Sequence, residues 1–233
     1  IWHLRFHWQA ERARILQSLQ RGEYYFAPLL HIIKADGVII HLWCSTDALV
    51  LKALTLAITP LLPISRRCTH VKGNGGLKYA VSDVQEHLAA HDFVMRTDVK
   101  SFYESIDHYL MLDKLAVYIK DRFVLNLLWQ SMRRCVERGG LFREINQGLP
   151  RGCPLSPLLG AFFLTELDEA LEQHNVFYVR YMDDVLIMSK RRWGLRKAIK
   201  RLNEVFSALG LEQHPDKTFI GRIEKGFDFL GYY

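Results

Sequence analysis

The 233-residue chain lacks the cysteine patterns of a secreted or zinc-binding protein. Its four cysteines form no Cys-x-x-Cys pair, and no nearby histidine has zinc-ligand spacing. The N-terminal residues also lack the pattern of a signal peptide. We therefore expect small, buried, apolar cysteines in a reducing compartment and a cytoplasmic location. The cysteines concerned are Cys44, Cys68, Cys135 and Cys153.

Long hydrophobic runs and a phosphate-binding loop are also missing. The most apolar window, residues 48–62, is short and is interrupted by Lys52 and two threonines, so we expect no membrane partner. Residues 73–76 have the sequence Gly-Asn-Gly-Gly, but the Lys-Ser/Thr of a phosphate loop does not follow. This segment therefore predicts a flexible turn.

Positive charge is in modest excess and is distributed unevenly. The net charge of +6 and a pI near 9.1 favour a polyanionic partner. A first group of cations, which we expect to contact nucleic acid, consists of Arg66, Arg67, Lys72 and Lys78. A second group comprises Lys190, Arg191, Arg192, Arg196, Lys197, Lys200 and Arg201. A charge cluster on a helix is more often a solvated face than a binding site, and both alternatives stay open.

Two adjacent acids are present at the centre of a predicted β-hairpin. Asp183 and Asp184 lie between two short apolar, β-branched runs, residues 176–179 and 185–188. A solvated turn explains an isolated Asp-Asp pair well, because aspartate is common in turns. However, a third acid, Asp98, ends another strand-like run, residues 93–97. Three acids from separate strands are the oxygen ligands that a two-magnesium phosphoryl-transfer site needs.

Helical and extended periodicities alternate without regular βαβ spacing, which predicts an α+β fold. A hairpin is predicted over residues 31–41, around Ala-Asp-Gly. A helix is predicted from Asp47, as its N-cap, to residue 62, and a strand at residues 226–232. Further helices are predicted at residues 4–19, 107–134, 158–173 and 195–209. In the third of these, we expect a core stripe of Leu159, Phe162, Phe163, Leu167 and Leu171.

Five sequence blocks, taken in order, resemble the signature of reverse transcriptases. They are Arg-Thr-Asp-Val-Lys-Ser-Phe-Tyr at 96–103, Gln-Gly-Leu-Pro-Arg-Gly-Cys-Pro-Leu-Ser-Pro at 147–157, Tyr-Met-Asp-Asp at 181–184, Leu-Gly-Leu with Pro-Asp-Lys-Thr at 209–218, and Phe-Asp-Phe-Leu-Gly at 227–231. The blocks cover most of the chain. They are most similar to prokaryotic enzymes of the group II intron type and to related bacterial lineages, some of them antiviral.

The resemblance implies a right-hand polymerase fold with an antiparallel palm sheet. Fingers are expected at residues 1–91 and 113–147, and the palm at residues 92–112 and 148–233. The thumb would then follow residue 233, so we expect the chain to be a fragment of a longer protein.

The resemblance also implies roles for the acids. Asp98 and Asp183 would bridge two Mg²⁺ ions, which Mn²⁺ can replace, and the Val99 carbonyl would be a further ligand. Asp184 would be the third catalytic acid. Tyr103 falls where the family places the bulky residue under the sugar, and it would exclude a 2′-hydroxyl and so select deoxynucleotides.

Cations near the triphosphate depart from the family pattern. Lys34 matches the fingers lysine, but His41 stands where an arginine is usual, and an unperturbed histidine is mostly neutral at pH 7. Arg151 replaces the usual glutamine, and it either pairs with the triphosphate or with an acid of the site. Lys217 matches a lysine near the pyrophosphate, a candidate proton donor.

The expected activity is RNA-directed DNA polymerisation, with an RNA template, a DNA or RNA primer and dNTPs as partners. One alternative is an RNA-dependent RNA polymerase, which shares the acids but must admit the 2′-hydroxyl that Tyr103 would exclude. The other is a catalytically silent nucleic-acid-binding or maturase module, which the two departures at His41 and Arg151 would fit. The sequence does not define the oligomeric state.

Overall fold

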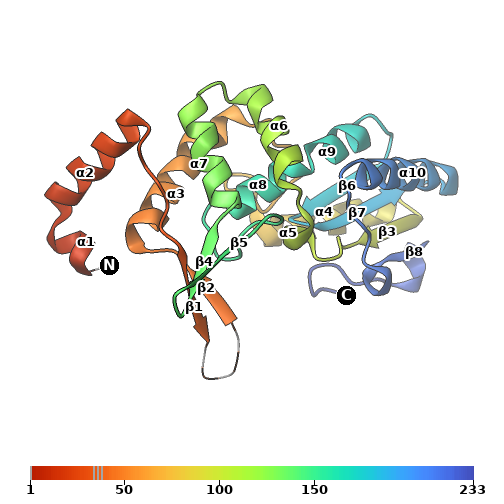
Figure 1. Ribbon diagram of the computed structural model, residues 1–233. Coiled ribbons are helices and arrows are strands. Elements are labelled where there is room, and N and C mark those ends of the chain that lie inside the picture. Colours follow the sequence, from red (N-terminus) through yellow and green to blue (C-terminus); the bar gives the residue numbers. More distant parts are fainter. Residues whose placement is uncertain (1, 34, 36, 38) are drawn as a thin grey trace. The chain divides into compact units, whose positions relative to one another are not determined.

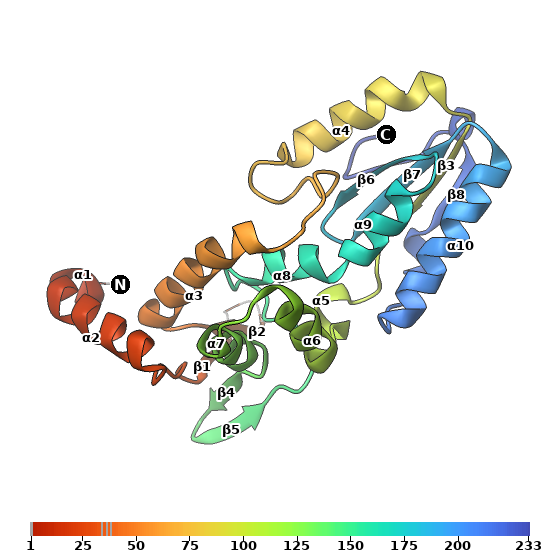
Figure 2. The same cartoon turned by 90° about the horizontal axis from the view of Figure 1, so that it is seen from above.

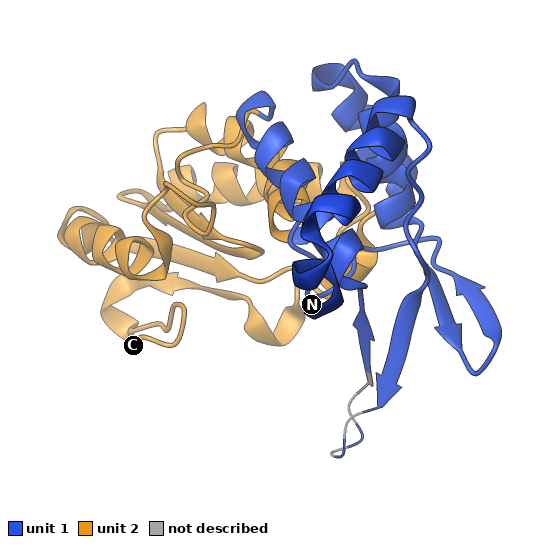
Figure 3. Ribbon diagram, turned by 90° about the vertical axis from the view of Figure 1, so that its left-hand side faces the viewer, with its two compact units in different colours: residues 1–62, 107–156 blue, residues 63–106, 157–233 orange. Residues whose placement is uncertain are grey.

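A computed structural model describes residues 2–233 apart from 34, 36 and 38 (Figure 1). The chain forms two compact units, which are coloured separately in Figure 3. The first unit contains residues 1–62 and 107–156, and the second contains residues 63–106 and 157–233. The expected bounds of fingers and palm stay a prediction: residues 63–91, expected in the fingers, group with the second unit, and residues 107–112 and 148–156, expected in the palm, group with the first. Each unit is described by itself.

In its described residues, the first unit contains five α-helices, one of them short, and a small sheet. Its helices are α1 (Trp2–Phe6), α2 (Trp8–Arg21), α3 (Ser45–Ile58) with η1 (Thr59–Leu61), α6 (His108–Tyr118) and α7 (Arg122–Met132). Ile15, Tyr24 and Val50 form a buried cluster in this unit. Among the described residues of the whole chain, no helix combines the length and apolar character needed to cross a bilayer.

Three helix predictions need correction. The helix expected at residues 4–19 is divided into α1 and α2. Asp47 is not an N-cap: α3 begins two residues earlier, and the buried Asp47 carboxylate accepts hydrogen bonds from the Tyr24 hydroxyl (2.7 Å) and the Ala27 amide (2.9 Å). The segment 107–134 contains two helices, because Asp107 and Asp121 each cap a new N-terminus.

The first unit's sheet has the strand order β2-β1-β4-β5. Strands β1 (Leu29–Ile33) and β2 (Ile39–Leu42) are antiparallel, which confirms the predicted hairpin. Strands β4 (Cys135–Arg138) and β5 (Leu141–Glu144) form a second hairpin that the sequence analysis missed. The turn between them is Gly139-Gly140, both with positive φ, which glycine adopts without strain.

The second unit is organised around an antiparallel sheet with the order β6-β7-β3-β8. Its strands are β3 (Phe93–Thr97), β6 (Phe177–Tyr181), β7 (Asp184–Ser189) and β8 (Phe219–Arg222). Helix α4 (Gly76–His87), followed by η2 (Leu88–Ala90), packs against one face. In Figure 2, α9 (Thr165–Glu172) and α10 (Arg192–Ala208) lie on the side of the sheet away from α4.

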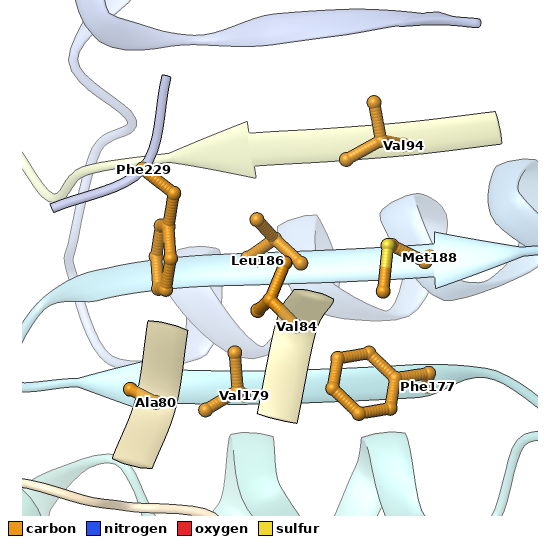
Figure 4. Packing of buried hydrophobic residues seen from close by; sticks show 8 residues of the cluster. All are labelled: Ala80, Val84, Val94, Phe177, Val179, Leu186, Met188 and Phe229. Carbon is orange, nitrogen blue, oxygen red and sulfur yellow. The ribbon is translucent and has the colours of Figure 1, made fainter. Parts of the chain in front are cut away.

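Strand alternation explains this layering. Val94, Leu186 and Met188 point toward α4 and pack with its Ala80 and Val84 (Figure 4). Their neighbours along the central strands, Met95, Val185 and Ile187, have no exposed surface either, so both faces of the sheet are buried at β3 and β7. The predicted turn at residues 73–76 leads into α4, whose N-cap is Gly75.

The remaining predictions for this unit had mixed outcomes. The helix expected at 158–173 is broken at Leu164 into α8 (Ser156–Phe163) and α9, but its five core residues are all buried as predicted. The last strand was misplaced. It is β8, and residues 226–232 instead turn back on themselves, since Gly226, Leu230 and Gly231 have positive φ.

Other segments completing the chain are short. They are α5 (Phe102–Ser105), η3 (Pro215–Lys217) and η4 (Ile223–Lys225). The expectation of four buried cysteines is wrong for two of them: Cys44 is exposed and Cys135 is only partly buried, whereas Cys68 and Cys153 are buried.

A buried ion pair connects this sheet to its helices. Arg180 of β6 has no exposed surface, and its guanidinium donates to both carboxylate oxygens of Asp168 in α9, with Nε at 3.0 Å. The same group donates to the carbonyl of Ala161 in α8 (3.1 Å). Such a pair contributes to stability only while both partners remain, because either charge alone is costly to bury.

We therefore predict that Asp168→Asn lowers the free energy of unfolding by about 3–5 kcal/mol, the cost of an uncompensated buried charge. Chemical denaturation measures this difference. Glu204→Gln is the matched control, because Glu204 pairs with Arg201 on the exposed surface of α10 and should contribute at most about 1 kcal/mol. Equal losses of unfolding free energy in the two variants would show that the buried ion pair contributes no more to stability than the exposed one.

Candidate active site

The three predicted acids lie at one end of the second sheet. Thr97, the last residue of β3, pairs with Val185 of β7, so Asp98 follows at the end where β7 begins with Asp184. Tyr181 and Asp184 form the last pair of the β6–β7 hairpin, which leaves Met182 and Asp183 as a two-residue turn. The predicted acidic hairpin is therefore present.

The turn has a constrained backbone. Met182 has a φ of 56°, in the left-handed region that residues other than glycine, asparagine and aspartate rarely occupy. A non-glycine residue keeps such a conformation only when its surroundings hold it there. Two side chains from other elements provide that support.

Arg180 and His70 bind the two backbone groups of Met182. The Arg180 Nη1 donates to the Met182 carbonyl (2.9 Å), and the Met182 amide donates to His70 Nδ1 (2.9 Å). Because Nδ1 accepts, the ring proton is on Nε2, which donates to the Pro157 carbonyl (3.0 Å). Burial lowers the pKa of His70, consistent with this neutral form. Sequence reasoning missed both residues.

The carboxylates repel one another in a partly buried setting. Burial raises the pKa of Asp183 to about 7, assisted by a hydrogen bond and charge repulsion from Asp98. Burial also raises the pKa of Asp184, and the Asp98 charge adds to this shift, whereas Lys217 and Arg96 oppose it. The ionised form of each group is therefore less stable in the fold than in water.

Lys217 supplies a counter-charge. Its ammonium, at the end of η3, donates to the carboxylate of Asp98, and its side chain remains 56% exposed. The loop before it is fixed to the end of β3, since the His214 amide donates to the Asp98 carbonyl (2.8 Å). The Thr218 hydroxyl also contacts that of Thr97 (2.7 Å). Lys217, which the sequence analysis expected near the pyrophosphate, thus contacts the carboxylate of Asp98 in this structure.

The Val99 carbonyl is available as an oxygen ligand. Val99 forms an isolated antiparallel bridge with Gln213. The hydrogen bonds of this bridge run from Lys100 N to Glu212 O and from His214 N to Asp98 O, so Val99 occupies a non-hydrogen-bonded position. Its carbonyl consequently accepts no backbone hydrogen bond among the described residues.

These donors fit a hard divalent cation. In the part of the chain that the structure describes, no three His, Cys, Asp or Glu side chains are already gathered tightly enough to hold a metal. The three carboxylates meet at one end of the sheet, where burial and the neighbouring Asp98 carboxylate raise the pKa values of Asp183 and Asp184, and the ammonium of Lys217 contacts Asp98. A cation would relieve this repulsion, and a set of oxygen ligands favours magnesium or manganese over zinc.

Tyr103 lies beside the acids. It belongs to α5, is half-buried and packs on Gly160 of α8, where an added Cβ would lie 3.3 Å from the tyrosine ring. Burial raises the pKa of Tyr103 to about 12, and the Asp183 charge contributes in the same direction. The phenol therefore remains protonated.

The other predicted nucleotide ligands belong to the first unit. Lys34 lies outside the described residues. His41 contacts His31 across the β1–β2 pair (3.2 Å), and burial, followed by the charges of His31 and Arg134, lowers the pKa of His41. It is thus neutral at pH 7. Arg151 is exposed in the turn between Pro150 and Gly152.

The first cationic cluster lies before and within the start of α4. Arg66, Lys72 and Lys78 are exposed. Arg67 instead pairs with Asp83 (2.8 Å) and stacks over the Phe177 ring (5.1 Å), so part of its charge is used within the fold.

Comparison with known families gives a match over most of the chain. The model of the family described as "Reverse transcriptase (RNA-dependent DNA polymerase)" matches residues 43–233. This range contains all five sequence blocks and all three acids of the site.

Curated relatives include proteins from several organisms. YkfC of Escherichia coli is 25% identical over 178 residues, which are 60% of this chain and 46% of that protein. The group II intron-encoded protein LtrA of Lactococcus lactis is 23% identical, covering 86% of this chain and 34% of that protein. The Retron Mx162 reverse transcriptase of Myxococcus xanthus is 27% identical, covering 56% of this chain and 31% of that protein. The chain thus spans about a third to just under half of the length of these relatives.

Among solved structures, the telomerase of Candida albicans in complex with a fragment of telomeric RNA is similar in fold. The TM-score is 0.57 with 14% sequence identity, over 80% of this chain and 36% of that chain. With the family match, it confirms the expected α+β right-hand polymerase fold and its antiparallel sheet.

We predict that His70→Phe keeps the ring but exposes the Met182 amide to hydrogen exchange, because no acceptor then replaces Nδ1. The loss of this partly buried hydrogen bond should also cost about 1 kcal/mol of unfolding free energy. Exchange at single-residue resolution reports the first effect, and denaturation reports the second.

His87→Phe is the control for this substitution. His87 is also half-buried in the second unit and stacks on Phe177 (centroids 4.4 Å apart), but it does not contact the turn. If Met182 stays protected in His70→Phe, or loses protection equally in both variants, His70 does not hold the turn.

Proposed function

Because the chain belongs to the reverse transcriptase family, we propose that it is the catalytic part of an RNA-directed DNA polymerase. The second unit would be the palm and the first unit the fingers. The observation that carries this proposal is the meeting of Asp98, Asp183 and Asp184 at one end of the antiparallel sheet. Nucleotidyl transfer needs such a carboxylate cluster to hold metal ions beside the reacting groups.

We propose that Asp98 and Asp183, with the Val99 carbonyl, hold two Mg²⁺ ions and that Asp184 supports them. When bound, the ions activate the primer hydroxyl and neutralise charge on the triphosphate. The chain's own contribution is to fix the ligands: β3 ends at Asp98, and the turn bound by Arg180 and His70 presents Asp183. The ammonium of Lys217 would leave Asp98 when a cation takes its place and could then serve the pyrophosphate.

Tyr103 would select the sugar of the incoming nucleotide. Its ring packs on Gly160, and after burial the Asp183 charge is the next cause of the raised pKa of Tyr103, which supports a place near the reacting centre. A wide ring fixed under C2′ leaves no space for a hydroxyl group, so deoxynucleotides would be preferred.

Cationic side chains would also bind the triphosphate of the incoming nucleotide. The neutral His41 makes a weak phosphate ligand, so we propose that Lys34 and Arg151 perform this task. Template RNA and a DNA or RNA primer would contact the exposed cations Arg66, Lys72 and Lys78. Arg67 would contribute less, since it already pairs with Asp83.

We predict that Asp183→Asn reduces primer extension on an RNA template by about a thousandfold or more. The variant lacks a proposed metal ligand, and the bound metal would stabilise the charge of the transition state by several kcal/mol. The fold should not suffer. Removing one of two repelling carboxylates should instead raise the unfolding free energy in metal-free buffer, and Mg²⁺ should then stabilise the variant less than the parent protein.

The matched control is Asp216→Asn, the same chemical change at an exposed acid next to Lys217. It should keep both the extension rate and the Mg²⁺-dependent stabilisation. Parent-like extension by Asp183→Asn would remove the acids from the mechanism. A parent protein that binds the RNA but extends no primer would favour the silent nucleic-acid-binding alternative.

A further prediction concerns sugar selection. Tyr103→Val should raise the rate of rNTP relative to dNTP incorporation on the order of a hundredfold, the scale expected when a steric clash of a few kcal/mol is removed. Single-nucleotide incorporation measures this ratio, with Tyr79→Val as the control because Tyr79 is an exposed tyrosine of α4. Efficient use of rNTPs by the parent protein would instead support the RNA polymerase alternative.

A further inference from the structure

A groove of about 550 Å³ lies between α10 and the edge strand β8 in the second unit. Figure 2 shows these two elements next to each other. Four cationic side chains line the groove, Arg192 and Arg196 from α10 and Arg222 and Lys225 from β8 and η4. Its floor is apolar and includes Phe93, the first residue of β3.

The charge of this groove is largely uncompensated. Arg192, Arg196 and Lys225 have no ion-pair partner in the described part of the chain, whereas Arg222 pairs with Glu224 (3.2 Å). No acidic residue occurs between residues 190 and 203, a stretch with seven cations. Four cations from three elements thus line one groove, which differs from a solvated helix face where charges point apart.

The groove is separate from the proposed polymerase site. Phe93 begins β3 and pairs with Arg222, whereas Asp98 follows the end of β3, so five steps of extended chain separate this cationic end of the groove from the carboxylates. At about 3.3 Å per residue, this distance is about 16 Å. The two sites therefore occupy opposite ends of the same sheet, with opposite charge.

An exposed aromatic ring accompanies the cations. Trp193 of α10 is 70% exposed, and the guanidinium of Arg196 lies 5.1 Å from the centre of its ring. An indole held in this way offers a flat surface on which an unpaired base can stack. The apolar face of α10 is meanwhile buried in the fold through Leu195, Ala198 and Leu202, so the helix has no free apolar face to insert into a membrane.

From these observations we infer that the groove binds the sugar-phosphate backbone of RNA, with Trp193 stacking on an adjacent unpaired base. Arg192 and Arg196 are one helical turn apart, about 6 Å along the axis, and can meet successive backbone charges. The inference deepens the proposed function: the protein would hold its RNA at a second point, about 16 Å from the nucleotidyl-transfer site.

The test compares two pairs of substitutions on one helix. Arg192→Ala with Arg196→Ala removes two groove cations. Lys197→Ala with Arg201→Ala removes the same charge from side chains of α10 that do not line the groove. All four positions are exposed, so both variants should fold, which thermal unfolding verifies. The probe is an RNA hairpin with a single-stranded tail, titrated at several salt concentrations.

We expect the groove variant to bind this RNA about ten- to thirtyfold more weakly at physiological salt and the control less than threefold. The plot of log affinity against log salt concentration has a negative slope, and its magnitude should decrease by about 1.5 in the groove variant because two phosphate contacts are lost. Trp193→Ala should weaken binding of the tailed hairpin more than that of a blunt hairpin. Nucleotide addition at saturating primer–template should be unchanged in every variant.

Several results would overturn the inference. Equal weakening by the two charge variants would show that only net charge matters, and unchanged binding in both would show that RNA does not use the groove. Loss of binding to phosphatidylserine vesicles, with RNA binding intact, would assign the groove to a lipid surface. A different result would distinguish the two proposals. If the parent protein extends no primer, the proposed polymerase function is refuted, while the comparison of RNA binding by the groove and control variants still tests the groove.

Discussion

The second unit depends on one buried side chain, that of Arg180. Its guanidinium binds Asp168 in α9, the Ala161 carbonyl in α8 and the Met182 carbonyl in the hairpin turn. Its backbone also binds the segment before α4, because the Arg180 amide donates to the Arg67 carbonyl and its carbonyl accepts from the Thr69 amide, each at 2.9 Å. Burial opposes the guanidinium charge, but Asp168 outweighs this effect, so the pKa of Arg180 is raised. One cation therefore fixes two helices, a loop and a turn to the same strand.

This support determines what the acids can do. A flexible turn would let repelling carboxylates move apart into water, and their pKa values would return to the ordinary range. Here Met182 is bound on one side by Arg180 and on the other by His70, so Asp183 stays close to Asp98 despite the repulsion. The repulsion remains in the folded protein, where the proposed divalent cation would relieve it. In that proposal, the site exchanges some stability for affinity toward the cation, as is common where function requires like charges together.

Local patterns predicted much of the fold, and long-range contacts account for the errors. Apolar runs flanking Asp183 and Asp184 were sufficient to place the acidic hairpin, and helical spacing identified the buried stripe from Leu159 to Leu171. The last strand was misplaced because Gly226, Leu230 and Gly231 adopt positive φ, which apolar composition does not reveal. His70 was missed because it meets Met182 from 112 positions away, and an isolated histidine carries no pattern. For the same reason, the role of Asp168 was apparent only once α9 was placed against β6.

The antiparallel sheet also explains why opposite charges can occur in one small unit. Strand β3 is central, with β7 on one side and β8 on the other, and its five residues separate the acids from the basic groove. Over about 16 Å, and with a Debye length of about 8 Å at physiological ionic strength, exposed charges at the two ends are largely screened from each other. The groove cations therefore leave the carboxylates unneutralised, and the cation that contacts Asp98 at its own end of the sheet is Lys217. A polyanion bound at the groove would in turn experience little repulsion from the acids. In the proposed function, the length of a single strand would thus let one fold hold metal ions at one end and RNA phosphates at the other.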